Sequence, residues 1–193
     1  MENNQSKWVR AYTNIAFIKY WGKKNEEFIL PQNNSLSLTL DAFYTETKVT
    51  FDKNLDNDIL ILDGEEEGPN ALKKAQVILD LVREMAGIKT RARIDSKNFV
   101  PTAAGLASSA SGLAALAGAA SLAAGLDLSE TELSRLARRG SGSASRSIYG
   151  GFAEWLQGTS DEDLQDDKGR RRGLCFNAFF MRAFRSRSGN SPF

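Results

Sequence analysis

Polar and apolar residues alternate along the first third of the chain, and this alternation predicts β-structure there. From position 45 to 51, Thr, Thr, Val and Phe alternate with Glu, Lys and Thr. This two-residue period is typical of a strand with one buried face. The run DILILD at 58–63, which ends at Gly64, predicts a second strand, and residues 90–95 predict a weaker third.

Helical spacing of apolar residues begins after the second predicted strand. It places one face of a helix at Leu72, Ala75, Leu79, Val82 and Ala86, with a stop at Gly87. The Ala-rich run 113–126 predicts a buried helix. Ser129 and Glu132 form a capping-box pattern that begins another helix, and this helix ends at Gly140. Strands, a helix, a strand and packed helices together indicate an α+β fold rather than a regular βαβ alternation.

Composition narrows the classes of function. With 193 residues, 41% hydrophobic and 25% charged, the chain has enough residues for one good core. The first residues lack the apolar core of a signal peptide, no apolar run reaches a membrane span, and the single cysteine suits a reducing cytoplasm. There is no histidine, which excludes Ser-His-Asp and Cys-His nucleophiles and removes the commonest zinc ligand. Lys, Arg, Ser and backbone amides remain, and they suit phosphate groups.

The net charge of +1 conceals an uneven distribution. After Asp167 there is no acidic residue, while seven Lys and Arg residues follow it, which leaves 18 basic and 24 acidic residues before them. After about residue 165 the sequence has neither a helical face nor strand alternation. We therefore expect a domain at 1–165 and an aberrant basic tail at 166–193 that does not belong to the fold.

The segment PTAAGLASSAS at 101–111 places a Gly-containing turn before the Ala-rich helix. Unpaired amides and the positive end of the helix dipole make such a place a cradle for phosphate, and Gly105 lets the backbone approach the anion. A capped helix in which Ser108 and Ser109 bond their own amides explains the pattern equally well. The segment is not the GxxxxGK[ST] loop.

Two other segments have a composition that suits anions. GSGSASRS at 140–147 combines mobile backbone and hydroxyls with Arg146, whose fork matches phosphate oxygens. A Gly/Ser linker is the alternative, but a linker does not need the arginine. IKYWGK at 18–23 brings Lys19 and Lys23 beside Tyr20 and Trp21. These lysines could share an anion or could be solvated charges beside a core segment.

Taken together, and in their order along the chain (18–23, 101–111 and 140–147), the three segments resemble one protein family. PTAAGLASSA resembles the ATP loop of the GHMP superfamily of small-molecule kinases. IKYWGK and GSGSASRS resemble mevalonate diphosphate decarboxylases, the bacterial form most of all, and NNSLSLTLD at 33–41 and SIYGGFAEW at 147–155 add agreement. The resemblance runs from about Arg10 to Gly158, so it covers the N-terminal portion of that family.

The resemblance implies a fold and an activity. The fold is the GHMP-type N-terminal domain, a two-layer sheet-and-helix arrangement with a left-handed βαβ unit like that of a ribosomal protein. The activity is ATP-dependent decarboxylation of mevalonate 5-diphosphate to isopentenyl diphosphate, with ATP and Mg²⁺, in isoprenoid synthesis. The family is often homodimeric. We expect this chain to be cytoplasmic, with neither a membrane nor a nucleic-acid partner.

The resemblance also implies roles for individual residues. Lys19 and Arg146 match residues assigned to catalysis. The substrate contacts match Tyr20, Trp21, Gly22, Lys23, Ser141, Gly142, Ser143, Ala144, Ser145 and Arg146. The nucleotide contacts match Pro101, Ala104, Gly105, Leu106, Ala107, Ser108, Ser109 and Ser111. Ser108 or Ser109 is the candidate ligand of the magnesium ion that accompanies ATP.

The chain also departs from the family pattern. Members usually exceed 300 residues, and their later half supplies a ferredoxin-like domain and an essential aspartate, to which nothing after Gly158 corresponds. We therefore expect a chain of low or no activity. The alternatives are another GHMP kinase, such as phosphomevalonate kinase, or a non-catalytic ligand-binding remnant, whose basic tail would touch acidic partners.

Overall fold

The computed structural model describes residues 6–26, 28–100 and 108–157. The three predicted strands are present: β4 (Ser35–Asp52) contains 45–51, β5 (Ile59–Leu62) lies within 58–63, and the third is β7 (Arg91–Phe99). The described elements are β1 (Val9–Ile18), β2 (Lys23–Asn25), β3 (Leu30–Pro31), β4 (Ser35–Asp52), β5 (Ile59–Leu62), β6 (Glu65–Glu66), α1 (Pro69–Ala86), β7 (Arg91–Phe99), α2 (Ser108–Ala123), α3 (Glu130–Gly140), the 3₁₀ helix η1 (Gly142–Ile148) and β8 (Phe152–Trp155).

One mixed sheet carries the fold. Its order is β1-β4-β7-β5-β6, and β8 pairs with the first residues of β4. The β5–β7 pair is parallel and α1 lies in the connection between them, whereas the other pairs of this sheet are antiparallel. The α+β fold class predicted from the sequence is confirmed. The long strand β4 contacts β1, β7 and β8, so it links the start of the chain to the segment around residue 150.

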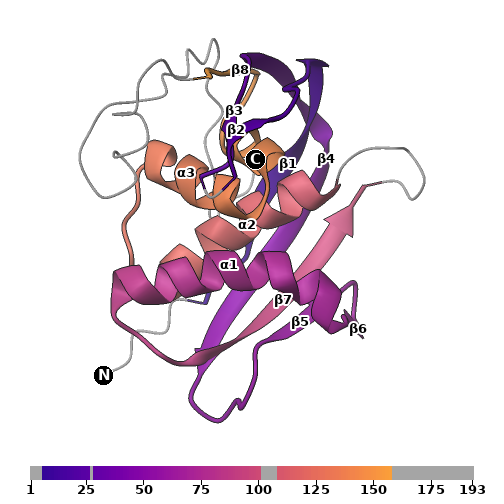
Figure 1. Cartoon of the computed structure of the whole chain (residues 1–193). Coiled ribbons are helices and arrows are strands. Elements are labelled where there is room, and N and C mark those ends of the chain that lie inside the picture. The colour runs from indigo at the N-terminus through magenta and orange to yellow at the C-terminus, as the bar shows by residue number, and fades with distance from the viewer. Residues whose placement is uncertain (1–5, 27, 101–107, 158–193) are drawn as a thin grey trace.

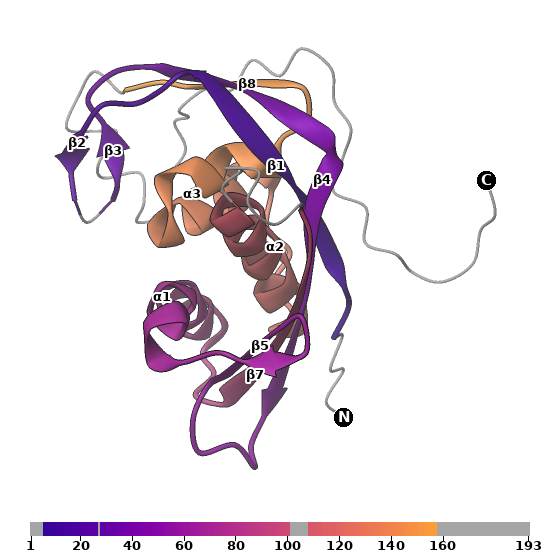
Figure 2. The ribbon, with the colours of Figure 1, turned by 90° about the vertical axis from the view of Figure 1, so that its right-hand side faces the viewer.

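The three described α-helices cover the same face of this sheet (Figures 1 and 2). The Ala-rich α2 lies against β4 and β1, and α1 and α3 pack on α2. Fully buried side chains from both layers form the core: Val9, Val49, Ile78, Leu79, Val82 and Ile94. Because most residues of α2 are alanine or glycine, the helix axis can lie close to the strands.

The opposite face of the sheet carries exposed apolar residues near one end. Phe17 on β1 and Phe152 on β8 lie with their ring centroids 6.2 Å apart, and both are about half exposed or more. The described helices lie on the other face of the sheet (Figure 2). Within the described residues, no helix has the length and apolar character needed to cross a membrane.

The helix boundaries follow the sequence signals. Helix α1 stops at Gly87, whose φ of 66° is in the left-handed region, and its N–H bonds to the carbonyls of Arg83 and Glu84. The capping box before α3 is complete: the Ser129 hydroxyl accepts from the Glu132 N–H, and the Glu132 carboxylate accepts from the Ser129 N–H at 2.8 Å. The helix predicted to end at Gly140 does so.

Replacing Ser129 with alanine should lower the free energy of unfolding by about 1 kcal/mol, the usual cost of losing an N-cap. The hydrogen bonds from Ser129 hold the pKa of Glu132 below its ordinary value. The contribution of this carboxylate to the free energy of unfolding is therefore fully present above the ordinary carboxyl pKa. It is lost as the pH falls through the lowered pKa of Glu132 in the folded chain. Urea unfolding of the parent and Ser129→Ala at neutral and acidic pH would check this. A stability difference that stayed constant into acid would contradict it.

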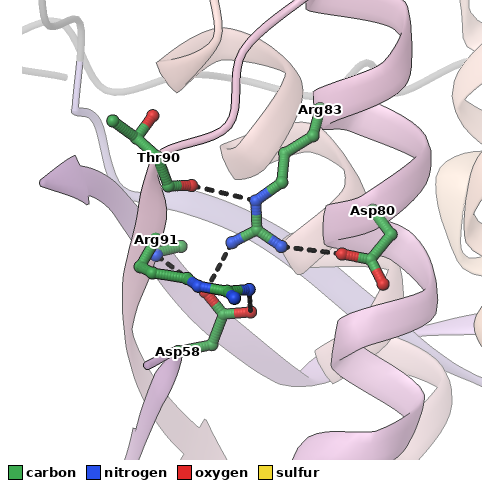
Figure 3. Close-up of polar contacts among 6 residues, drawn as sticks. Asp58, Asp80, Arg83, Thr90 and Arg91 are labelled. Carbon is green, nitrogen blue, oxygen red and sulfur yellow. Dashed lines mark hydrogen bonds and ion pairs between the residues drawn. The ribbon is translucent and has the colours of Figure 1, made fainter. Parts of the chain in front are cut away.

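A buried ion pair joins α1 to the sheet (Figure 3). The Arg83 guanidinium donates to the Asp58 carboxylate, to the Thr90 carbonyl at 2.9 Å and to Asp80 at 2.8 Å. The same Asp58 oxygen accepts from the Ala92 N–H at 2.8 Å. One carboxylate at the start of β5 thus holds the helix and β7 together, and sequence patterns gave no indication of this contact.

Candidate functional site

Arg146 is the centre of the candidate site. It lies on η1, is 3% exposed, and its guanidinium donates to the Ser35 hydroxyl at 2.7 Å. A longer contact of 3.4 Å reaches the side-chain oxygen of Asn14. Both partners are neutral. Within residues 6–26, 28–100 and 108–157, no carboxylate lies within ion-pair distance of Arg146, and its Nε has no hydrogen-bond partner.

The electrostatics of this position follow from burial. Removal from water lowers the pKa of the Arg146 guanidinium. The charge interaction with the nearby Tyr20 phenol raises this pKa, but its effect is smaller. A buried cation without a counter-charge is costly, and an anionic ligand would remove that cost. Arg146 therefore has the properties of an anion receptor rather than of a structural ion pair.

Asn14 ties η1 to strand β1. Its amide nitrogen donates to the Ser143 carbonyl at 3.1 Å and to the Ser147 hydroxyl at 2.7 Å. The sequence pattern assigned neither Asn14 nor Ser35 to the site. The available signal was a polar residue beside apolar ones, Asn14 in the run TNIAFI and Ser35 in the run SLSLTL.

The Gly/Ser segment is an ordered 3₁₀ turn and not a linker. The hydroxyls of Ser141 and Ser143 lie 3.2 Å apart and are partly accessible, so both can reach a ligand. The Ser145 hydroxyl is buried and donates to the Gly142 carbonyl at 2.7 Å, and Ala144 is fully buried. Of the predicted substrate contacts in this turn, Ser141 and Ser143 have accessible side chains, while Ala144 and Ser145 support the turn from inside.

Tyr20 reaches the same place from the segment after β1. Its ring packs edge-on against Trp155 with centroids 5.0 Å apart. A side chain added at Gly142 would lie 3.0 Å from the Tyr20 hydroxyl. Tyr20, Gly142 and Arg146 are therefore brought together around Trp155, although more than 120 residues separate Tyr20 from the turn.

The neighbours of Tyr20 are more exposed. Asn33 fixes the backbone of this segment, accepting from the Trp21 N–H at 2.8 Å and donating to the Lys19 carbonyl at 3.0 Å. The Trp21 side chain is 73% exposed. Lys23 pairs with Glu26 at 2.7 Å. Lys19 is exposed and forms no ion pair with any described residue, so it is available to a ligand.

The predicted nucleotide loop is described only from Ser108 onward, because Pro101, Ala104, Gly105, Leu106 and Ala107 lie outside the described residues. Ser108 and Ser109 begin the sixteen-residue α2, and both retain some exposure. Ser111 is fully buried, and its hydroxyl bonds to Thr45 at 2.8 Å and to the Ser108 carbonyl at 3.0 Å. Ser111 thus anchors the start of α2 to the sheet.

This chain has been compared with protein-family models and with known proteins. The model of the diphosphomevalonate decarboxylase-like N-terminal domain matches residues 11–165. A phosphomevalonate decarboxylase of Haloferax volcanii is 36% identical over 160 residues, which are 83% of this chain and 49% of the relative. The diphosphomevalonate decarboxylase of Homo sapiens is 43% identical over 164 residues, 77% of this chain and 40% of the relative.

Solved structures give the same result. The mevalonate diphosphate decarboxylase of Enterococcus faecalis is 64% identical with a TM-score of 0.77, over 82% of this chain and 49% of that one. The enzyme from Staphylococcus aureus is 61% identical with a TM-score of 0.76, over 82% and 48%. Another solved relative, MDDEF, is in complex with MVAPP, AMPPCP and magnesium and is also 64% identical with a TM-score of 0.77, over 82% and 48%. This chain spans about half the length of these proteins.

Proposed function

The chain belongs to the diphosphomevalonate decarboxylase-like family, and we propose that it binds mevalonate 5-diphosphate and ATP for ATP-dependent decarboxylation to isopentenyl diphosphate. The observation that carries the proposal is Arg146, a buried cation whose described partners are a hydroxyl and an amide oxygen. A diphosphate would supply the missing charge.

The accessible donors around Arg146 support this assignment. Ser141 and Ser143 present their hydroxyls from the same turn, and Tyr20 lies beside its first residue. Hydroxyls and a guanidinium are the groups that hold phosphate oxygens with directional hydrogen bonds. We propose that these residues, with the backbone of Gly142, hold the diphosphate, and that Lys19, Trp21, Gly22 and Lys23 contact the substrate from the exposed side.

The start of α2 supports the nucleotide half of the proposal. Amides in the first turn of a sixteen-residue helix have no intrahelical partners and favour a phosphate group. Ser108 or Ser109 would hold the magnesium ion together with the ATP phosphates. The described residues contain no group of three Cys, Asp or Glu side chains that could bind a metal by themselves, so magnesium would arrive with the nucleotide.

The proposed chemistry needs positioning and charge neutralisation. ATP would transfer its γ-phosphoryl group to the tertiary hydroxyl of mevalonate 5-diphosphate, which releases ADP and the hydroxyl proton and turns a poor leaving group into a good one. The departing phosphate leaves an electron-poor carbon, which draws the electron pair of the C–CO₂⁻ bond and releases carbon dioxide. The buried Arg146 and the exposed Lys19 would both stabilise the charges that develop, and Arg146 fills this role best because it is held away from bulk water.

Replacing Arg146 with alanine should weaken the binding of mevalonate 5-diphosphate by about 1.5–3 kcal/mol, the scale of a charge-assisted hydrogen bond. Titration calorimetry on the purified chain is the measurement. Binding is tested rather than turnover because the chain spans about half the length of its relatives.

The control is Arg93→Ala, which removes an exposed arginine paired with Asp95 on β7 and should leave substrate affinity unchanged. Equal affinity of the parent and Arg146→Ala would remove Arg146 from the site. Mevalonate 5-phosphate should bind more weakly than the diphosphate. Tighter binding of the monophosphate would instead assign the chain the substrate indicated by the name of the Haloferax relative.

We further propose a cytoplasmic location, which the single cysteine suits, and a homodimer, which the sequence resemblance implies. The solved relatives support a small-molecule substrate, since MVAPP is bound to one of them. The tail assignment at 166–193 falls outside the described residues and stays a prediction.

A further inference from the structure

Trp155 is buried in a way that its own chemistry does not explain. It ends β8, is 1% exposed, and its Nε1–H has no hydrogen-bond acceptor among the described residues. Buried tryptophans usually satisfy this donor. Burial of Trp155 therefore costs the hydrogen bond that its Nε1–H would make to water. A smaller apolar residue would fill a core without that cost.

The surroundings of the ring are the elements of the proposed diphosphate site. Tyr20 packs edge-on against it at 5.0 Å, and the Arg146 guanidinium carbon lies 5.8 Å from its centroid. The backbone of Gly142 runs against its edge, because a Cβ there would lie 2.9 Å from the ring carbon Cη2. Ser35, which accepts a hydrogen bond from Arg146, is the register partner of Trp155 across the β4–β8 pair.

Two chain segments that are far apart in sequence thus lie against one rigid ring: the segment at 19–22 through Tyr20, and η1 through Gly142 and Arg146. A third segment, β4, places Ser35 beside Trp155 in the register of the β4–β8 pair. A flat, rigid side chain with two torsions is suited to fixing distances between such groups, and its face stabilises a guanidinium when both are removed from water.

We propose that Trp155 is a positioning residue of the diphosphate site, which sets the place of the Arg146 guanidinium relative to Tyr20 and the turn at Gly142. This inference rests on the proposed function, and it adds a residue that need not touch the substrate. It predicts that the ring determines anion affinity and not nucleotide affinity, because the ATP site lies at the start of α2, on a different element.

The test uses the full chain with inorganic pyrophosphate as the probe. Calorimetry should give an affinity for Trp155→Leu at least about thirtyfold below that of the parent, and Trp155→Phe, which restores an aromatic face, should recover part of the loss. Binding of magnesium AMPPCP to both variants should match the parent. Equal pyrophosphate affinity in the parent and Trp155→Leu would overturn the inference and leave the proposed function standing. If Trp155→Leu lost both pyrophosphate and AMPPCP binding, the ring would support the fold in general, and the specific positioning role would be wrong.

A second measurement needs no substitution at Trp155. The chain has three tryptophans, and Trp8→Phe and Trp21→Phe assign their indole N–H resonances by elimination. Pyrophosphate should move the Trp155 resonance and leave that of Trp8 in place. An unmoved Trp155 resonance in a parent that binds pyrophosphate would refute the positioning role. A parent that binds neither pyrophosphate nor mevalonate 5-diphosphate would refute the proposed function and the inference with it.

Discussion

Replacing Asp58 with alanine should lower the free energy of unfolding by about 3–5 kcal/mol, because removing one partner of a buried ion pair leaves the other charge buried without compensation. The Asp58 side chain is 1% exposed, and that of Arg83 is 9% exposed. Without the carboxylate, Arg83 stays buried with the exposed Asp80 as its remaining ion-pair partner, and the Ala92 N–H loses its acceptor (Figure 3). Urea unfolding of the parent and of Asp58→Ala, followed by circular dichroism, measures this difference in the free energy of unfolding.

Two further variants separate the causes of this loss. Asp95→Ala removes an aspartate whose partner, Arg93, is exposed, and it should change stability little, because exposed pairs contribute little. The double variant Asp58→Leu with Arg83→Met should recover part of the loss, because well-packed apolar residues can replace a buried pair. A double variant as unstable as Asp58→Ala would mean that the hydrogen bond to the Ala92 amide, and not the buried charge, accounts for the cost.

The sequence predicted those parts of the fold that depend on local spacing. The helical face from Leu72 to Ala86 and the capping box at Ser129 are set by residues within one or two turns of each other, so the pattern alone locates them. The strand pattern at 45–51 was correct, but β4 begins ten residues earlier, at Ser35. In the segment at 140–147, for which the residues alone left a linker open, Gly140 ends α3, and the residues from Gly142 onward form an ordered 3₁₀ helix.

The site was predictable in part, for a different reason. Arg146 and the serines around it were identified by their chemistry and by resemblance. Their fixed places depend on contacts across more than 110 residues, such as Arg146 with Ser35 and with Asn14. No local period encodes such pairs, because they result from the register of β4 with β1 and β8. Trp155 lies in the segment SIYGGFAEW, which matches the family, but the positioning role proposed for it depends on the pairing of β8 with β4 beside Ser35.

Replacing Gly142 with valine should lower the affinity for mevalonate 5-diphosphate by at least about a hundredfold, close to 2.7 kcal/mol. The first added carbon would lie 2.9 Å from Cη2 of Trp155 and 3.0 Å from the Tyr20 hydroxyl. Trp155 is fully buried and cannot turn away, so the turn that carries Arg146 must move instead. A shift of an ångström at a directional anion site removes most of its hydrogen bonding, and overpacking should also cost about 1–3 kcal/mol of stability.

Gly140→Ala is the matched control. Its added carbon would lie 2.8 Å from Cδ1 of Ile78 and 3.3 Å from Cδ2 of Leu113, so it crowds the core beneath α3 and not the turn. Both variants should unfold at lower temperature, but the folded Gly140→Ala chain should bind the diphosphate as the parent does. Calorimetry well below both unfolding midpoints makes this comparison. If both glycine variants lost affinity equally, general destabilisation would explain the effect, and the contact of Gly142 with Trp155 and Tyr20 would have no specific part in binding.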